Sequence, residues 1–269
     1  MTLLTVVQRA GVTALALILL AGFTPSGAAA QSIWGGVPPG RGASIEVSKV
    51  AFSEDQGLST FSLAYYFGAR FPIRRDLQIV GELPFATAKT SNTPFSRQAI
   101  GNPYVGVEWE QSETVVWEAG LRLPLSDNPA FNNASILGLA SDAADRLEAW
   151  FDRALSIQVA PNLIHRNRDG LVLRVRAGPS LFIPMGGARG NTELIVAYAG
   201  QVGYEGDLVQ LLGGVSGRTI TTGEALTYNH AVLNVAFDLG GFRPAAFVRV
   251  PFGDLKGVAA VYGIVFTFG

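Results

Sequence analysis

The chain has 269 residues, no cysteine and nearly balanced charge, with 20 Lys and Arg against 21 Asp and Glu. This balance gives no reason to expect nucleic acid as a partner, and without cysteine we expect neither a disulfide nor a lipoprotein anchor. Charged residues make up 15% of the chain, whereas ordinary soluble domains carry roughly 25%. The high hydrophobicity is not gathered into a run of about 20 apolar residues after residue 30, so no transmembrane helix is predicted.

Residues 1–30 predict a secretory signal peptide. Arg9 is the only charged residue of this segment, an apolar stretch covers 12–23, and three consecutive alanines close it. The apolar stretch is too short to span a bilayer, and small residues suit a cleavage site. We therefore expect export of the chain, with residues 31–42 as an irregular periplasmic lead-in.

From residue 43 to the C-terminus, apolar residues alternate with polar or small ones. Because successive side chains point to opposite faces of a strand, this period of two predicts β-strands with one apolar face. The last run places Val258, Ala260, Tyr262, Ile264, Phe266 and Phe268 on one face and Ala259, Val261, Gly263, Val265 and Thr267 on the other. We expect twelve strands, at 43–53, 58–71, 76–87, 102–112, 114–125, 153–165, 170–183, 192–204, 207–218, 227–238, 242–252 and 257–268.

Short and long connections take turns between these strands. The short ones contain Asp-Gly at 169–170 and Gly-Gly at 240–241, which are hairpin turn signals. The connections at 88–101 and 126–152 are long. Outer-membrane barrels combine short periplasmic turns, longer external loops and an even strand number. The pattern predicts one all-β domain over 43–269, a transmembrane antiparallel up-and-down β-barrel of twelve strands, with ten as the alternative.

The phase of the alternation separates a lipid-facing set from a lumen-facing set. Charged residues within strands fall almost entirely on the phase opposite the apolar residues. Because a charge facing lipid costs about 2–4 kcal/mol at the midplane of the bilayer, we expect these charges inside the barrel. The outward positions include Ile79, Leu83, Val105, Val107, Trp109, Trp117, Leu121, Ile157, Val159, Leu171, Leu173 and Val175.

The charged inward positions form the candidate site. Rings of charged side chains tune the selectivity of pores, but a narrow barrel can also be filled by paired charges that pass nothing. Two interpretations of the inward charges therefore stay open, a structural ion-pair network and a narrow passage for a solute. The predicted lumen lining is Glu82, Glu108, Glu118, Arg122, Arg174, Arg176, Glu193 and Arg249, and its densest part, the first six of these, is the predicted constriction.

One segment departs from the strand pattern. Residues 141–151 predict a short amphipathic helix in the longest external loop, with Ser141 as its N-cap. This helix could pack on the rim and shield loop backbone, which we favour, or enter the barrel mouth as a gate. The residues of the possible gate are Asp145, Arg146, Leu147 and Trp150.

Catalytic chemistry has little support in the sequence. His165 falls at a predicted turn, and His230 points inward with Ser216 near it in sequence, but nothing in the sequence places a nucleophile or an acid beside it. No metal-ligand spacing, phosphate-binding loop or nucleophile elbow is present. We expect no enzymatic activity, no metal and no cofactor.

Two stretches resemble a known family. The first is Glu82-Leu83-Pro84-Phe85 followed by 100–109, and the second is 120–125. They resemble the outer-membrane barrels of the MetA-pathway of phenol degradation family, in which a strand ending in a Pro-aromatic pair, a polar loop and a Gly-Asx pair recur. The usual Gly-Asp of that family is Gly101-Asn102 here. The resemblance implies a transporter of hydrophobic or aromatic small molecules, and it carries over no catalytic residue.

The end of the chain resembles the C-terminal recognition strand of outer-membrane proteins, through Phe266-Thr267-Phe268. This resemblance implies the barrel-assembly machinery as a partner. We expect the Gram-negative outer membrane as the location, with lipid bilayer and lipopolysaccharide around the barrel, and passive passage of a small-molecule solute as the function. The alternatives are a closed structural or adhesion barrel acting through its external loops, and a secreted soluble β-protein with its apolar face inside.

Overall fold

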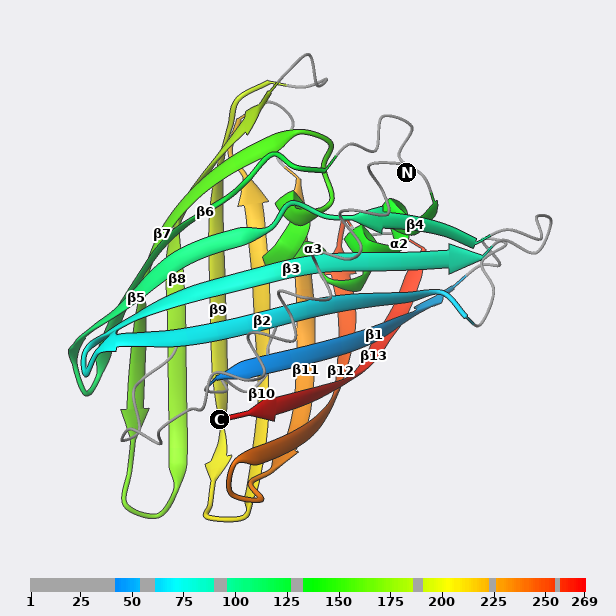
Figure 1. Ribbon diagram of the computed structural model, residues 1–269. Coiled ribbons are helices and arrows are strands. Elements are labelled where there is room, and N and C mark those ends of the chain that lie inside the picture. Colours follow the sequence, from blue (N-terminus) through cyan, green and yellow to red (C-terminus); the bar gives the residue numbers. More distant parts are fainter. Residues whose placement is uncertain are drawn as a thin grey trace, which may run out of the picture.

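The computed structural model describes residues 42–53, 61–89, 96–126, 133–185, 191–222, 226–254 and 257–269. Within these ranges the chain forms one antiparallel sheet that closes into a barrel (Figure 1). The predicted signal peptide and almost all of the lead-in fall in residues 1–41, outside the described part.

The strands of the described ranges begin and end within three residues of the predicted boundaries, except that the second strand begins five residues later than predicted. They are β1 (Ala43–Phe52), β2 (Leu63–Arg74), β3 (Leu77–Lys89), β4 (Ser96–Ile100), β5 (Tyr104–Ser112), β6 (Val115–Arg122), β7 (Ala154–Arg166), β8 (Leu171–Pro184), β9 (Glu193–Glu205), β10 (Val209–Ile220), β11 (Thr227–Phe237), β12 (Phe242–Gly253) and β13 (Val258–Phe268).

The pairing of β1 closes the ring. This strand pairs with β13 on one side, where Ala43 lies opposite Phe268, and with β2 on the other. The one strand outside the prediction is β4, which lies in the connection expected at 88–101. It pairs with the end of β3, and β5 pairs with the beginning of β3, so β4 and β5 share one place in the wall. The barrel therefore has twelve strand positions, as predicted.

The exposure of side chains confirms the predicted faces. Each of the twelve outward positions named above is at least 37% exposed, whereas Glu118 is 1% exposed and Arg249 is fully buried. An apolar exterior around a charged interior suits a barrel surrounded by lipid. It contradicts the alternative of a soluble β-protein, which needs the opposite arrangement.

The start of β13 departs from the predicted alternation. The register with β1 shifts here, because Ala51 pairs with Ala260 while Phe52 pairs with Val258. As a result Ala259 is exposed and Ala260 is buried, the reverse of the prediction. A bulge inserts one extra residue into a strand, so it inverts the faces on one side of it.

The long connection between β6 and β7 folds into the barrel. It contains α2 (Asn133–Ser141), α3 (Ala143–Arg146) and the 3-10 turn η1 (Leu147–Ala149), where one helix over 141–151 was predicted. Ser141 ends α2 instead of capping a helix, and the Asp142 carboxylate caps α3 by accepting the backbone N–H of Asp145. No helix within the described ranges is long and apolar enough to cross a membrane.

These helices lie between β2 and β3 on one side and β11 to β13 on the other (Figure 1). Leu137 and Trp150 are fully buried in a cluster with alanines of the inner wall, namely Ala64, Ala86, Ala88 and Ala99. Small side chains at these wall positions leave room for α2. The expectation that the helix packs on the rim is therefore wrong, because the segment fills part of the lumen.

Candidate functional site

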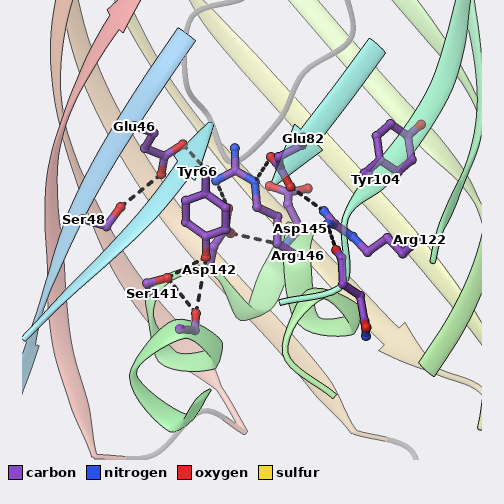
Figure 2. Close-up of polar contacts among 12 residues, drawn as sticks. Glu46, Ser48, Tyr66, Glu82, Tyr104, Arg122, Ser141, Asp142, Asp145 and Arg146 are labelled. Atoms are coloured by element: carbon purple, nitrogen blue, oxygen red, sulfur yellow. Dashed lines mark hydrogen bonds and ion pairs between the residues drawn. The ribbon is translucent and has the colours of Figure 1, made fainter. Parts of the chain in front are cut away.

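The site is built by the segment 133–150, which we call the inner segment, and by the strand residues that face it. Arg146 lies at its centre, because its Nη1 donates hydrogen bonds to Glu46 Oε2 at 2.8 Å and to Asp142 Oδ2 at 3.0 Å. Its Nε is 2.8 Å from Glu82 Oε2, and its guanidinium lies 4.0 Å from the centre of the Tyr66 ring. Figure 2 shows this arginine between carboxylates of β1 and β3.

The surroundings keep Arg146 charged. Burial alone would lower the pKa of its guanidinium, but the carboxylates of Glu46, Glu82 and Asp142 outweigh it and raise the pKa well above its ordinary value. A buried cation of this kind is stable only while its partners remain in place, since an unpaired buried charge is strongly unfavourable.

The acids of the inner segment face arginines of three other strands, β8, β10 and β12. Asp142 Oδ2 is 3.7 Å from Arg249 Nη2, Asp145 Oδ1 is 3.7 Å from Arg176 Nη1, and Glu148 forms a short ion pair with Arg218. The inner segment thus presents its cation toward β1 and β3 and its acids toward β8, β10 and β12.

The pKa values of these acids follow from the same contacts. Burial would raise the pKa of Asp142, but Arg249 and then Arg146 bring it below its ordinary value. Burial would also raise the pKa of Glu148, and Arg218 lowers it instead. For Asp145, burial and the neighbouring charge of Asp142 prevail, so its pKa lies above its ordinary value.

Most of the predicted lining residues come together around the inner segment. Arg122 Nη2 donates to Glu82 Oε1 at 2.8 Å, and Arg249 Nη2 donates to Glu46 Oε1 at 2.9 Å. A second group forms around Glu118, whose Oε2 lies 3.3 Å from Arg176 Nη2. Each of these pairs joins two strands that are separated by one strand in the barrel wall.

Glu108 and Glu118 lie directly opposite each other on β5 and β6. Each carboxylate has its own partners. Gln78 Nε2 donates to Glu108 at 2.6 Å, while Tyr104 Oη and Gln158 Nε2 donate to Glu118 at 2.8 and 2.7 Å. The pair is therefore held by donors from several strands, which offsets the repulsion between like charges.

Two predicted lining residues lie apart from the inner segment. Arg174 forms a short ion pair with Glu205, the last residue of β9, near the turn into β10. Glu193 is the first residue of β9, at the opposite end of the strand, and is half-buried. Of the two arginines of the predicted constriction on β8, Arg176 therefore lies beside the inner segment and Arg174 lies apart from it.

All four predicted gate residues are buried inside the barrel. Leu147 packs in a cluster with Phe182, Ile195 and Ile220 of the wall. Trp150 Nε1 donates to the hydroxyl of Tyr66 at 3.2 Å. Asp145 and Arg146 are 2% and 4% exposed, so these residues belong to the same buried network as the lining.

Several residues of the network were absent from the predicted site. They are Glu46, Tyr66, Asp142, Glu148 and Arg218, each at most 3% exposed. The strand phase places Glu46 and Arg218 inside, so that signal could have found them. Asp142 and Glu148 carried no such signal, because acids on a short loop helix are ordinarily solvated.

Three polar side chains on β9, β10 and β11 are buried without a hydrogen-bond partner in the described part of the chain. They are Gln201, Ser216 and His230. Ser216 and His230 are cross-strand neighbours, and His230 Nδ1 is 3.7 Å from Asp142 Oδ1. Neither hydrogen-bonds the other in the structure. Among the described residues no group of His, Asp and Glu is placed to hold a metal ion.

No protein-family model matches this sequence, and no curated protein matches it. Among solved structures, the COG4313 outer membrane channel from Pseudomonas putida F1 is similar with a TM-score of 0.55 at 10% identity, over 91% of this chain and 98% of that one. LpxR from Salmonella typhimurium gives 0.49 at 10% identity, over 84% and 99% of the two chains. A Pseudomonas aeruginosa FadL homologue gives 0.36 at 12% identity, over 76% and 66%.

At these identities the likeness concerns the fold. The Pseudomonas putida channel belongs to the MetA-pathway of phenol degradation family, the family that the sequence motifs resemble. The resemblance is therefore confirmed at the level of the fold, which is that of an outer-membrane β-barrel.

Proposed function

We propose that this protein is an outer-membrane channel for the passive passage of a small molecule and that the inner segment is its gate. The observation that carries the proposal is the charged segment folded into a closed barrel and held by ion pairs to opposite walls. Arg146 contacts Glu46 and Glu82 on one side, and Glu148 contacts Arg218 on the other. The gate residues and the lining residues then act as one assembly.

The contacts of the inner segment suit a movable element. Ion pairs between buried groups contribute little net stability, because the cost of removing both charges from water offsets most of their attraction. A hydrated lumen would solvate the separated charges when the segment leaves, which lowers the cost of opening.

The C-terminal end of the inner segment is held by three hydrogen bonds from one residue of the wall, Asn102. Asn102 donates from its side-chain amide to the carbonyl oxygens of Glu148 at 3.0 Å and Phe151 at 2.7 Å. Its backbone N–H donates to Ala149 at 2.6 Å. Asn102 follows β4 and belongs to the Gly101-Asn102 pair that carries the family resemblance. In the proposal, it is the pivot about which α2 and α3 move.

The setting of this function is the outer membrane of a Gram-negative bacterium, with lipid and lipopolysaccharide around the apolar exterior. Export would use the signal peptide predicted at 1–30, and the barrel-assembly machinery would recognise the closing strand β13. Exposed apolar side chains on most strands of the barrel support this setting. The resemblance implies a hydrophobic or aromatic solute, but the charged wall of the lumen favours a polar one.

Single-channel recording in planar bilayers tests the proposal. The wild-type protein should give rare, brief current steps, and Arg146→Ala should give longer and more frequent ones, because the variant removes the central cation of the gate. Arg74→Ala is the matched control, since Arg74 pairs with Asp76 at an exposed turn. The proposal fails if every variant stays silent while heat-modifiable gel mobility shows a folded barrel.

The same silence would support the second candidate, a closed structural or adhesion barrel. The observation that favours this candidate is the complete burial of residues 140–150 of the inner segment, in which Ala143, Ala144 and Ala149 are 0% exposed. In that case the ion pairs would only lock the barrel, and function would lie with its external loops.

A further inference from the structure

We infer that the solute of this lumen is a zwitterion with a guanidinium at one end and a carboxylate at the other. Arg146 and Asp142 of the inner segment occupy the places of these two groups in the closed state. The inference rests on the proposed function, because it names the solute class that the same lumen passes.

The wall offers a built site for the cation. Glu46, Tyr66 and Glu82 come from the adjacent strands β1, β2 and β3 and surround one guanidinium. Two carboxylates contact it at 2.8 Å, and the tyrosine ring lies beneath it at 4.0 Å. An aromatic face with flanking carboxylates suits a planar guanidinium, which stacks and donates in a fork.

The place of the carboxylate lies next to it. Asp142 Oδ2 is 3.0 Å from Arg146 Nη1 and 3.7 Å from Arg249 Nη2, and its Oδ1 is 3.7 Å from His230 Nδ1. The two subsites touch, because Arg249 also donates to Glu46 at 2.9 Å. A solute of amino-acid size can therefore reach both.

Removal of the inner segment would empty the places of Arg146 and Asp142, while Glu82 would keep Arg122 and Glu46 would keep Arg249 as partners. The two acids and two arginines that remain are balanced in charge. A zwitterion fills both empty places without changing this balance, whereas a singly charged solute adds a net charge and an aromatic hydrocarbon pairs with neither group. Because uncompensated charge in a narrow lumen is costly, passage favours the zwitterion.

Other polar groups on the barrel wall also favour a polar solute. Gln201, Ser216 and His230 are buried, and their side-chain polar atoms have no hydrogen-bond partner among the described residues. Buried polar groups normally have partners, so these groups suit water or a polar solute in the lumen. A hydrophobic solute could not form hydrogen bonds with these groups.

The experiment uses the double variant Asp142→Ala/Arg146→Ala, which empties both subsites, in planar bilayers. The probes are 4-guanidinobutyrate, the ureido analogue 4-ureidobutyrate, which keeps the carboxylate and loses the cation, and butylguanidine, which keeps only the cation. We expect 4-guanidinobutyrate to interrupt the current at roughly ten-fold lower concentration than either analogue, as loss of a charged contact in such a site predicts. Adding Glu82→Gln should abolish the difference between 4-guanidinobutyrate and 4-ureidobutyrate, because Glu82 belongs to the cation subsite.

A second readout covers a variant that folds but conducts poorly. In detergent, 4-guanidinobutyrate should raise the unfolding temperature of the double variant and leave that of Arg74→Ala unchanged. Equal effects of the three probes, or stronger block by benzoate, overturn the inference while leaving the channel proposal intact. Absence of current and of stabilisation in every variant overturns both.

Discussion

The guanidinium of Arg146 has three carboxylates within 3.0 Å of its nitrogens, those of Glu46, Glu82 and Asp142. One cation cannot neutralise three acids. Arg122 and Arg249 supply the remaining charge, through Glu82 and Glu46. At the scale of single residues, the lumen is therefore a chain of shared charges in which each group depends on its neighbours.

Removal of one member should be costly. Arg146→Ala leaves buried acids without their shared cation, and breaking a buried ion pair from one side typically costs about 3–5 kcal/mol of stability. Urea unfolding followed by tryptophan fluorescence measures this loss, since Trp150 is buried beside Tyr66. The control Arg74→Ala breaks an exposed pair and should cost about 0–1 kcal/mol. Equal losses would show that the network contributes no more than a surface pair.

A second prediction concerns the ring of Tyr104. It packs over two glycines of the inner wall, and a Cβ added at Gly120 would lie 2.2 Å from the tyrosine hydroxyl. That hydroxyl is fixed by its hydrogen bond to Glu118, so the ring cannot move freely. Gly120→Ala should cost about 1–3 kcal/mol, the usual penalty of overpacking. Gly200→Ala is the control, because nothing lies within 4 Å of its added Cβ; similar losses in both variants would contradict the packing explanation.

Single elements were predictable where one rule applied throughout. The period of two placed Leu173 and Val175 outside and Glu118 inside, because lipid and lumen impose the two faces of every strand. It failed at Ala259 and Ala260, since a bulge depends on pairing with β1 that no local pattern reveals. The short strand β4 was missed for the same reason, as only its pairing with β3 defines it.

The position of the inner segment could not be predicted from its local sequence. Its charges predicted a solvated helix near the rim, because acids and arginine are rarely buried without partners. Their partners come from strands far along the chain, such as Glu46 of β1 and Arg249 of β12. The place of the segment follows from this charge complementarity and from the small alanines of the wall, neither of which is local in sequence.

The response of this segment to acid follows from its pKa shifts. The pKa values of Asp142 and Glu148 are lowered, so the stability they contribute is full above their ordinary values and is lost as pH falls through the lowered ones. Asp145 has a raised pKa and acts in the opposite direction. We expect the gate to stay closed from neutral pH to about pH 4 and to open below it.

Conductance recorded at stepped pH measures this response. The variant Asp142→Asn/Glu148→Gln should be open at neutral pH, because it lacks both charges that hold the acid side of the gate. Opening of the wild-type channel near about pH 6 would contradict the prediction, because a histidine, not these carboxylates, titrates in that range.

At the scale of the whole molecule, the barrel inverts the usual order of a globular protein. Large apolar residues such as Leu171, Leu173 and Val175 are 41–53% exposed, while arginines such as Arg122 and Arg249 are at most 1% exposed. Water does not suit the exterior of this barrel, because exposing so much apolar surface to water is unfavourable. Lipid outside and a charge-paired interior account for both faces.

A charge placed on the exterior tests this assignment. Val175 lies near the middle of β8 and faces outward, so Val175→Arg should lower the stability of the barrel in lipid vesicles by about 2–4 kcal/mol. The control is Asp169→Arg in the exposed turn before β8, which should change stability by less than about 1 kcal/mol. Unfolding by denaturant in vesicles measures both. If Val175→Arg instead folds as well as the wild type in lipid and becomes stable in buffer alone, the exterior of the barrel does not face a membrane, and the channel proposal loses its setting.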